Sequence, residues 1–274
     1  MTQEHTTSAA SRVPKPRTLR FSFEDVPRDW FGGNAIASHV ANGVNLLFPA
    51  GERFFVRSVY RYLDRIDDPD LVARVRGFAG QEGRHAAAHE QYFDALRRQG
   101  YDVDTFLRFY ERVAYGFIEK LAPPALRLST TAACEHFTAI LAEFALRRRV
   151  LDLAHPAMRD LLLWHAAEEL EHRSVAFDVL EKVAPGRVTR VAGLAMASAC
   201  LGGFWIVGAL ALIAQEPNLP RREKLRLWRE ARARRGDGSV FRRGIREYLR
   251  KDFHPAQSPI DHLAEEYLAR AGIA

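Results

Sequence analysis

The sequence predicts an all-α protein, built as a bundle of long helices with a helical extension at its C-terminal end. Long stretches are rich in Ala, Leu, Arg and Glu, and apolar residues recur within them at steps of three and four. Alternating Val, Thr and Tyr runs, which are typical of strands, are scarce. The chain has 274 residues, of which 47% are hydrophobic, so it can bury a sizeable core in one or two domains.

Proline and glycine divide the chain into the expected helices. Periodicity begins after Gly33, and Asp67, Asp68 and Pro69 end the first helix and cap the second. The expected helical ranges are 35–64 with a kink or fresh start at Pro49, then 70–99, 104–121, 125–154 and 156–183. Gly100, the prolines at 123 and 124, and the Pro-Gly pair at 185 and 186 separate or end the later ones.

Three segments are expected along the chain. Residues 1–30 should be disordered or extended, because the stretch up to about Arg20 is polar and lacks the apolar core of a secretory signal. Residues 31–186 should form the bundle, and residues 187–274 an apolar helix followed by a basic helical extension. The two cysteines, Cys134 and Cys200, form neither a disulfide framework nor a CxxC motif, which favours the reducing cytoplasm.

The positive charge is concentrated in residues 221–251. This segment holds 13 Lys or Arg and four Asp or Glu, a local balance of +9 against +6 for the whole chain. A basic segment can serve nucleic acid, anionic lipid or a partner protein, or it can be a solvated Arg-rich helix. Few aromatic residues are interleaved with the cations, so nucleic acid is not an expected partner.

Residues 191–214 carry no charged side chain. At about 1.5 Å per residue, such a helix is long enough to span a bilayer core of about 30 Å, and the basic flank would then lie in the cytoplasm. The competing interpretations are a buried helix, or one that covers a hydrophobic groove or a dimer face. Because a helix without a polar face needs a cover, we expect a homodimer or contact with the inner face of the membrane.

The second expected helix carries ionisable side chains on an otherwise apolar face. At steps of three and four, this face reads Leu71, Val75, Phe78, Glu82, His85, His89, Phe93 and Leu96. A carboxylate and two imidazoles on a core-facing stripe are costly unless something compensates them, and a metal ion does so directly.

The range 156–183 repeats the pattern. Its apolar stripe is interrupted by His165, Glu169 and His172. The spacing Glu-x-x-His places both donors on neighbouring turns of one helix face, so that both can reach one ion. The motif occurs twice, as Glu82 with His85 and as Glu169 with His172.

Two further glutamates, Glu52 and Glu135, lie on apolar stripes of the remaining long helices. Neither has a Lys or Arg three or four residues away, so each is predicted to be an inward-facing carboxylate. The order Glu, ExxH, Glu, ExxH is the ligand set of carboxylate-bridged dinuclear iron and manganese bundles. One ExxH motif occurs often by chance, and the specificity lies in the ordered set.

The predicted metal ligands are therefore Glu52, Glu82, His85, Glu135, Glu169 and His172. The four glutamates among them are also the candidate catalytic residues. His89 and His165 are candidates for extra ligands or for groups that hydrogen-bond to ligands. Glu168 competes with Glu169, although only Glu169 has a histidine three residues further on.

Several motifs around these residues resemble one family. They are FPAGERFF, GQEGRHAAAHEQYF, CEHFTAI, WHAAEELEHRSVAFDV and YLRKDFHP. Together they resemble the bacterial family of predicted metal-dependent hydrolases, itself similar to the wider ferritin-like group, over about residues 30–255. The resemblance implies a ferritin-like four-helix bundle with a dinuclear metal site, and position by position it implies the same six ligands.

The predicted function is that of a dinuclear metal enzyme. Carboxylate oxygens with two imidazoles suit Fe, which we favour, or Mn, with Zn as an alternative. An iron pair with open positions favours O₂-dependent oxidation of a small or lipid-like substrate, whereas the same ions could activate water for hydrolysis. Iron binding or storage without catalysis, and a membrane-tethered scaffold with a structural metal, are the other hypotheses. The long apolar segment and the basic extension argue against a compact cage subunit.

Overall fold

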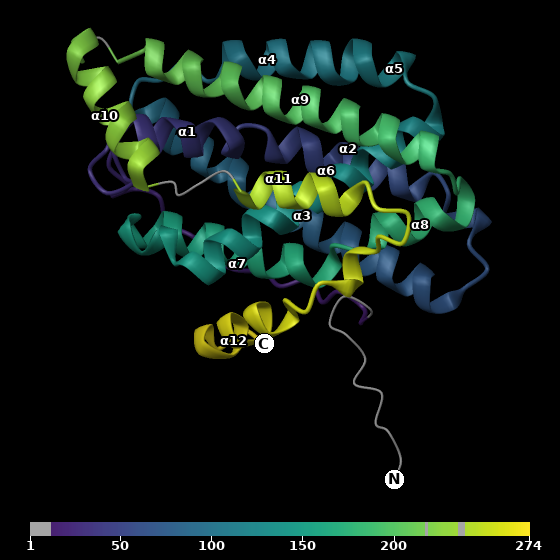
Figure 1. The fold of residues 1–274 in the computed structure, drawn as a ribbon. Helices are drawn as coiled ribbons and strands as arrows, with labels where there is room; N and C mark the ends of the chain where they lie inside the picture. The colour runs from purple at the N-terminus through teal and green to yellow at the C-terminus, as the bar shows by residue number, and fades with distance from the viewer. Residues whose placement is uncertain (1–11, 217–218, 235–238) are drawn as a thin grey trace.

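The structure, a computed structural model, describes residues 12–216, 219–234 and 239–274, and it confirms the all-α prediction (Figure 1). The helices are α1 (Ala35–Asn45), α2 (Phe48–Tyr60), α3 (Pro69–Arg98), α4 (Asp104–Val113), α5 (Glu119–Leu121), α6 (Pro124–Arg148), α7 (Pro156–His172), α8 (Val175–Val183), α9 (Arg187–Ala214), α10 (Arg221–Arg234), α11 (Ser239–Tyr248) and α12 (Asp261–Ala271). A π-helical stretch, Ala114–Ile118, joins α4 to α5. Over the described residues the only strand-like pairing is one bridge between Phe31 and Ala154.

Four helices, α2, α3, α6 and α7, surround the middle of the bundle. α2 packs on α3 and α6, and α6 packs on α7. α9 lies along α1 and α6 and, together with α4, covers one side of the bundle (Figure 1). α12 lies against α7 on the opposite side.

The ends of the helices follow the local chemistry of the sequence. The Asp68 side chain accepts hydrogen bonds from the backbone N–H groups of Asp70 and Leu71, so it caps α3 as predicted. The expected range 35–64 is divided before Phe48, and Pro49 therefore occupies the first turn of α2, where a missing N–H costs nothing. The expected range 125–154 instead ends at 148, because Arg149 adopts a left-handed φ of 51°.

The single helix expected over 156–183 is wrong, because the chain breaks after His172. The side chain of Arg173 is buried at this break, and it donates to the carbonyl oxygens of Leu170, Pro255 and Ser258. Arg173 therefore satisfies a free carbonyl group at the end of α7 and links this end to the C-terminal segment by hydrogen bonds.

Both described ends of the chain pack on the bundle. Residues 12–20, part of the segment expected to be disordered or extended, run in extended form against α3 and the C-terminus, where Lys15 donates to the carbonyl oxygen of Ala274. Residues 1–11 lie outside the described part of the chain. Beyond the bundle segment, Tyr248 and Phe253 are buried in the same apolar cluster as Phe177 of α8, so the C-terminal extension shares the core of the bundle.

Two apolar clusters flank the middle of the bundle. On α3, Val75 and Phe78 belong to one cluster, and Tyr92 and Leu96 belong to the other. The ionisable part of the α3 stripe lies between them. The stripe that runs through α7 into α8 is divided in the same way, with Met158 and Leu161 in the second cluster and Val175 and Val179 in the first. The bundle thus encloses a polar centre between two dry ends.

α9 is long and apolar enough to cross a membrane by length and composition alone. Its inner side packs closely, and a Cβ at Gly43 of α1 would lie 2.9 Å from the backbone nitrogen of Ala209. Its outer side is uncovered, with Val188, Ile206 and Leu210 exposed by 84%, 62% and 58%. The single chain therefore leaves an apolar helix face exposed, and whether a second copy or a membrane covers it stays a prediction.

We predict that Gly193→Ala destabilises the fold by about 1–3 kcal/mol, because the new methyl group would lie 2.6 Å from the carbonyl oxygen of Ser129 on α6. Gly202→Ala on the same helix is the control, since nothing lies within 4 Å of its Cβ position. The control should be neutral or stabilise by up to about 1 kcal/mol through helix propensity. Urea unfolding measures both, and equal stability of the two variants would contradict the close α6–α9 packing.

Candidate metal centre

The six predicted ligands meet in the middle of the bundle. α2 contributes Glu52, α3 contributes Glu82 and His85, α6 contributes Glu135, and α7 contributes Glu169 and His172; none is more than 4% exposed. Together with His89 and His165 they form four groups in which the ligand atoms lie within 4.8 Å of one another. The groups are Glu82–Glu135–His172, Glu52–Glu82–His85, His85–His165–Glu169 and Glu52–His89–His165.

The overlap of these groups gives the centre two halves. Glu135 and His172 define one half, and Glu52 and His85 define the other. Glu82 belongs to a group in each half. The Oε1 atom of Glu169 also lies between the halves, 3.5 Å from His172 Nε2 and 3.9 Å from His85 Nδ1. The glutamates of the two ExxH motifs thus occupy the positions from which a carboxylate can bridge two ions.

The atoms that face inward lack hydrogen-bond partners. Among the described residues, no partner is present for either carboxylate oxygen of Glu52, Glu82 and Glu135, for Oε2 of Glu169, for His85 Nδ1 or for His172 Nε2. A buried polar atom without a partner is costly, and native structures rarely keep one without an ion or water. A whole set of such atoms around one centre fits hard divalent cations held by carboxylate and imidazole donors.

The pKa shifts of the buried carboxyl groups also indicate a site for cations. Burial raises the pKa of Glu52 and of Glu82 well above the usual carboxyl value, and nearby carboxylates add to the rise. Burial also raises the pKa of Glu135, to about 7. Burial opposes the charge of Glu169 as well, but His172 and His165 together outweigh it and hold the pKa of that carboxyl well below its usual value. One imidazolium thus compensates one carboxylate, and cations are needed before all four carboxyl groups can ionise.

The orientation of His172 is set by a chain of hydrogen bonds. Arg17 donates to both oxygens of Glu171, at 2.7 and 2.9 Å. Glu171 accepts from Gln81 Nε2 at 2.7 Å, which leaves Gln81 Oε1 to accept from His172 Nδ1 at 2.8 Å. Nδ1 therefore carries a proton, and Nε2, which would have to give up its own proton to bind a metal ion, faces Glu82 and Glu135, each 3.3 Å away.

His85 is oriented in a similar way. Its Nε2 donates to Oε2 of Glu168 at 3.0 Å, and Glu168 in turn accepts from Arg17 at 3.1 Å. Burial and the neighbouring His165 lower the pKa of His85 well below its usual value, so the ring is neutral and Nδ1 carries a lone pair. Glu168 therefore supports a ligand and is not a member of the ligand groups. Arg17 thus supports both ExxH histidines, His85 through Glu168, and His172 through Glu171 and Gln81.

Sequence reasoning missed Gln81 and Arg17. His85 has the carboxylate of Glu168 behind it, whereas His172 has the side-chain amide of Gln81. The position of Gln81 directly before Glu82 was the only local signal for its role. Nothing local could identify Arg17, because 151 residues separate it from Glu168.

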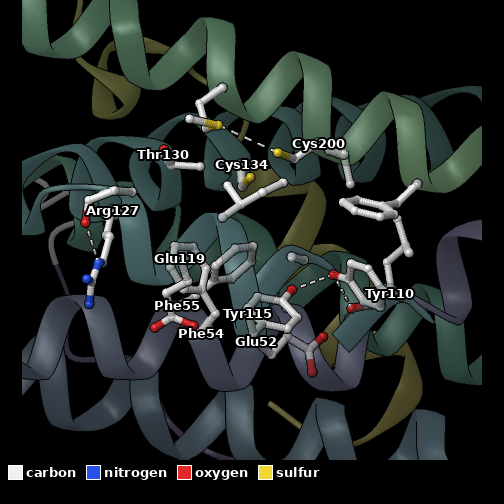
Figure 2. Close-up of a pocket in the computed structure, with 18 of the residues that line it drawn as sticks. Glu52, Phe54, Phe55, Tyr110, Tyr115, Glu119, Arg127, Thr130, Cys134 and Cys200 are labelled. Carbon is white, nitrogen blue, oxygen red and sulfur yellow. Dashed lines mark hydrogen bonds between the residues drawn. The ribbon is translucent and has the colours of Figure 1, made fainter. Parts of the chain in front are cut away.

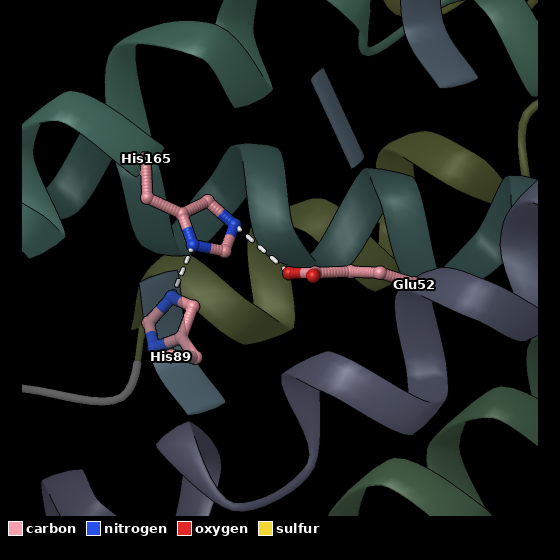
Figure 3. A group of neighbouring side chains, drawn as sticks. All are labelled: Glu52, His89 and His165. Atoms are coloured by element: carbon pink, nitrogen blue, oxygen red, sulfur yellow. Dashed lines mark hydrogen bonds and ion pairs between the residues drawn. The ribbon is translucent and has the colours of Figure 1, made fainter. Parts of the chain in front are cut away.

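The two extra histidines extend the half that contains Glu52 (Figure 3). His89 Nε2 lies 2.7 Å from His165 Nδ1, and His165 Nε2 lies 2.8 Å from Glu169 Oε1 and 3.7 Å from Glu52 Oε1. The ring of Phe48 packs on both imidazoles, with centroid distances of 4.6 and 4.4 Å. His165 is thus close enough to serve as a further ligand, with His89 fixing its ring.

Other polar residues of these helices lie away from the centre. His136 follows Glu135 but approaches the carbonyl oxygen of Gly244 at 2.9 Å, in agreement with the helix geometry. His254 approaches the carboxylate of Asp178 at 2.7 Å.

An apolar pocket reaches the centre at Glu52 (Figure 2). Its empty space is about 770 Å³, part of it open to solvent. The walls come from α2, the segment 110–122, α6 and α9, and they include Phe54, Phe55, Tyr110, Tyr115, Cys134, Cys200 and Phe204. Cys134, one residue before Glu135, lines this pocket.

Fold and centre together define a metal-binding helical bundle with carboxylate and histidine donors. The chain belongs to the family of predicted metal-dependent hydrolases, whose family model matches residues 15–258. Comparison with curated proteins and with solved structures gives no significant match. Family and centre agree on a metal-dependent enzyme.

We predict that His85→Ala and His172→Ala each lower the metal content to about one ion or less per chain, because each removes the nitrogen donor of one half of the centre. Elemental analysis of the purified variants measures this. His262→Ala, on an exposed position of α12, is the control and should keep the wild-type content. Full wild-type content in both test variants would exclude the two histidines as ligands.

We also predict that Arg17→Ala weakens metal binding by about 10- to 100-fold, as is usual when the partners that orient ligands are removed. Competition with a chelator measures the affinity. Arg12→Ala is a matched control from the same segment, since Arg12 forms an exposed ion pair with Glu265, far from the centre in its contacts among the described residues. Unchanged affinity in Arg17→Ala would show that the histidines hold their orientation without it.

Proposed function

We propose that the chain is an enzyme that uses two metal ions, iron by preference, to oxidise an apolar substrate with O₂. The observation that carries this proposal is that the buried carboxylates and imidazoles without partners lie at the inner end of an apolar pocket. Glu135 and His172 would hold one ion, Glu52 and His85 the other, and Glu82 and Glu169 both. An iron pair bound there supplies the activation of O₂.

The chain's own residues prepare the site for this chemistry. Arg17 acts through Glu171, Gln81 and Glu168 to keep both imidazoles in the orientation that donates inward. The apolar clusters at either end of the centre exclude water from it. In a rigid centre shielded from water, the surrounding groups are already oriented, so less reorganisation energy is needed when charge moves during the reaction.

The pocket supports an apolar substrate. Phenylalanine side chains dominate the wall next to Glu52, and Tyr110 and Tyr115 satisfy one another through their hydroxyl groups (Figure 2). Two charged side chains of the wall already have protein partners: Arg127 donates to the Ala122 carbonyl oxygen, and Glu119 forms an ion pair with Arg57. A chain of methylene groups fits such a surface better than a phosphate or a sugar does.

Hydrolysis is the second candidate, and the family description favours it. Two metal ions can lower the pKa of bound water and polarise a carbonyl group, with no need for O₂. An apolar ester could use the same pocket.

The test separates the two reactions. Protein loaded anaerobically with iron(II) should consume O₂ faster when alkanes, fatty acids or fatty aldehydes are added, and it should not cleave fatty acyl esters without O₂. Glu135→Gln should lower the rate by at least about 100-fold, because an ion is worth several kcal/mol to the reaction. Glu143→Gln is the control, since Glu143 lies on the same helix and pairs with Arg147 and Arg243. Anaerobic ester cleavage that depends on Glu135 would establish hydrolysis instead.

A further inference from the structure

The uncovered side of α9 forms one continuous apolar face. From Val188 to the end of the helix, the exposed residues follow helical spacing: Val188, Val191, Ala192, Ala195, Ser198, Ala199, Gly203, Ile206, Val207, Leu210 and Ala214. None of them is charged. The opposite side of the helix is occupied by α1 and α6 and contains the buried Arg190. α9 therefore has one face committed to the bundle and one face without a cover.

The segment from α4 to α5 adds a second stripe beside this face. Its exposed side chains include three cations, Arg108, Arg112 and Lys120, one anion, Glu111, and the apolar residues Phe109, Phe117 and Leu121. Phe109, Phe117 and Leu121 are exposed by 47%, 62% and 69%. The ring of Phe109 also packs on Phe204 of α9, so the two stripes adjoin (Figure 1). Among the described residues, Arg112 and Lys120 have no ion-pair partner.

The pocket that reaches Glu52 has its half-exposed wall on the same side. Ile118 and Ala122 are partly exposed, and they neighbour the exposed Phe117 and Leu121 in the sequence. Met196 and Leu201 of α9 form the facing part of the wall. Figure 2 shows α9 above the pocket and Glu52 at its far side. The pocket therefore connects the apolar face with the metal centre.

We infer that α9 and the α4–α5 stripe dock on the surface of an anionic lipid bilayer and that apolar substrates reach the pocket from the membrane. Apolar and aromatic side chains interleaved with Lys and Arg are typical of elements that lie in the bilayer interface. The cations reach the headgroups while the apolar side chains enter the acyl region. α9 lies on the membrane and does not span it, because spanning would strip its packed face, with Arg190, from α1 and α6.

A second copy of the chain fits this surface poorly. A two-fold interface buries the same surface on both copies, so it would take Arg108, Arg112 and Lys120 of each chain out of water with one exposed anion of the stripe, Glu111, to pair with them. Burying like charges together is costly, whereas anionic headgroups neutralise them. A partner chain would also cover the wall of the pocket at Ile118 and Met196. Docking itself needs no metal, and only the access of substrate from the membrane rests on the proposed function.

Sedimentation of the full chain with vesicles tests the inference. The protein should sediment with phosphatidylcholine vesicles that contain phosphatidylglycerol, and much less with phosphatidylcholine alone. Ile206→Glu with Leu210→Glu should lower the partition coefficient by more than about tenfold. Changing Arg108, Arg112 and Lys120 to Gln should lower it by roughly fivefold per cation, and by on the order of 100-fold together. Leu153→Glu is the control, since Leu153 is 57% exposed on the turn between α6 and α7.

Several outcomes would overturn the inference. They are the absence of vesicle binding, equal binding by the α9 double variant and the wild type, and a dimer in size-exclusion chromatography that the double variant dissociates. Metal content and oxidation of a short, water-soluble substrate should be unchanged in the double variant. Vesicle binding without oxidation of any substrate would support the docking surface and reject the proposed function alone.

Discussion

The compensation of charge inside an apolar bundle is the constraint on which the rest of the structure depends. Glu52, Glu82, Glu135 and Glu169 are buried together, and the free-energy penalty for an uncompensated buried carboxylate is several kcal/mol. The imidazolium of His172 compensates Glu169, whose pKa it helps to hold below the usual value, whereas the pKa of each of the other three carboxyl groups stays raised. Divalent cations would compensate the others, so folding of this core and binding of metal are thermodynamically linked. The apolar clusters on both sides strengthen that linkage, because they limit the water that could solvate the carboxylates in place of the ions.

The periphery of the molecule controls the geometry of the centre. Arg17 lies in an extended segment that precedes the first helix, and it holds Glu171 and Glu168 behind the two ExxH motifs. Arg173 ties the end of α7, directly after His172, to the C-terminal segment. Segments from both ends of the described chain thus fix helix α7 where its ligands project. A bundle of four helices alone would lack these restraints.

α9 has one face on the surface of the protein and another that lines the pocket next to Glu52. Its inner face supplies Met196, Cys200 and Phe204 to the pocket, and its outer face is uncharged and uncovered. Small residues allow it to approach α1 and α6 closely, as at Gly43 and Gly193. A hydrophobic helix that is half packed and half exposed provides a short path from an apolar environment to Glu52, which is the arrangement that an apolar substrate requires.

The sequence by itself determined the fold class, most helix positions and the residues that gather at the centre. Helical periodicity is local, so an ionisable residue on an apolar stripe must face the core wherever the helix packs, and this held for the stripes that contain Glu82 and Glu169. Tertiary structure alone decided which residues hydrogen-bond to the ligands. Arg17 and Glu168 are 151 residues apart in the sequence, so no local spacing predicts their contact. Tertiary structure also decided the break after His172, where the buried Arg173 donates to a helix carbonyl oxygen. It decided as well which face of α9 is covered, since the apolar residues of that helix are not confined to one side.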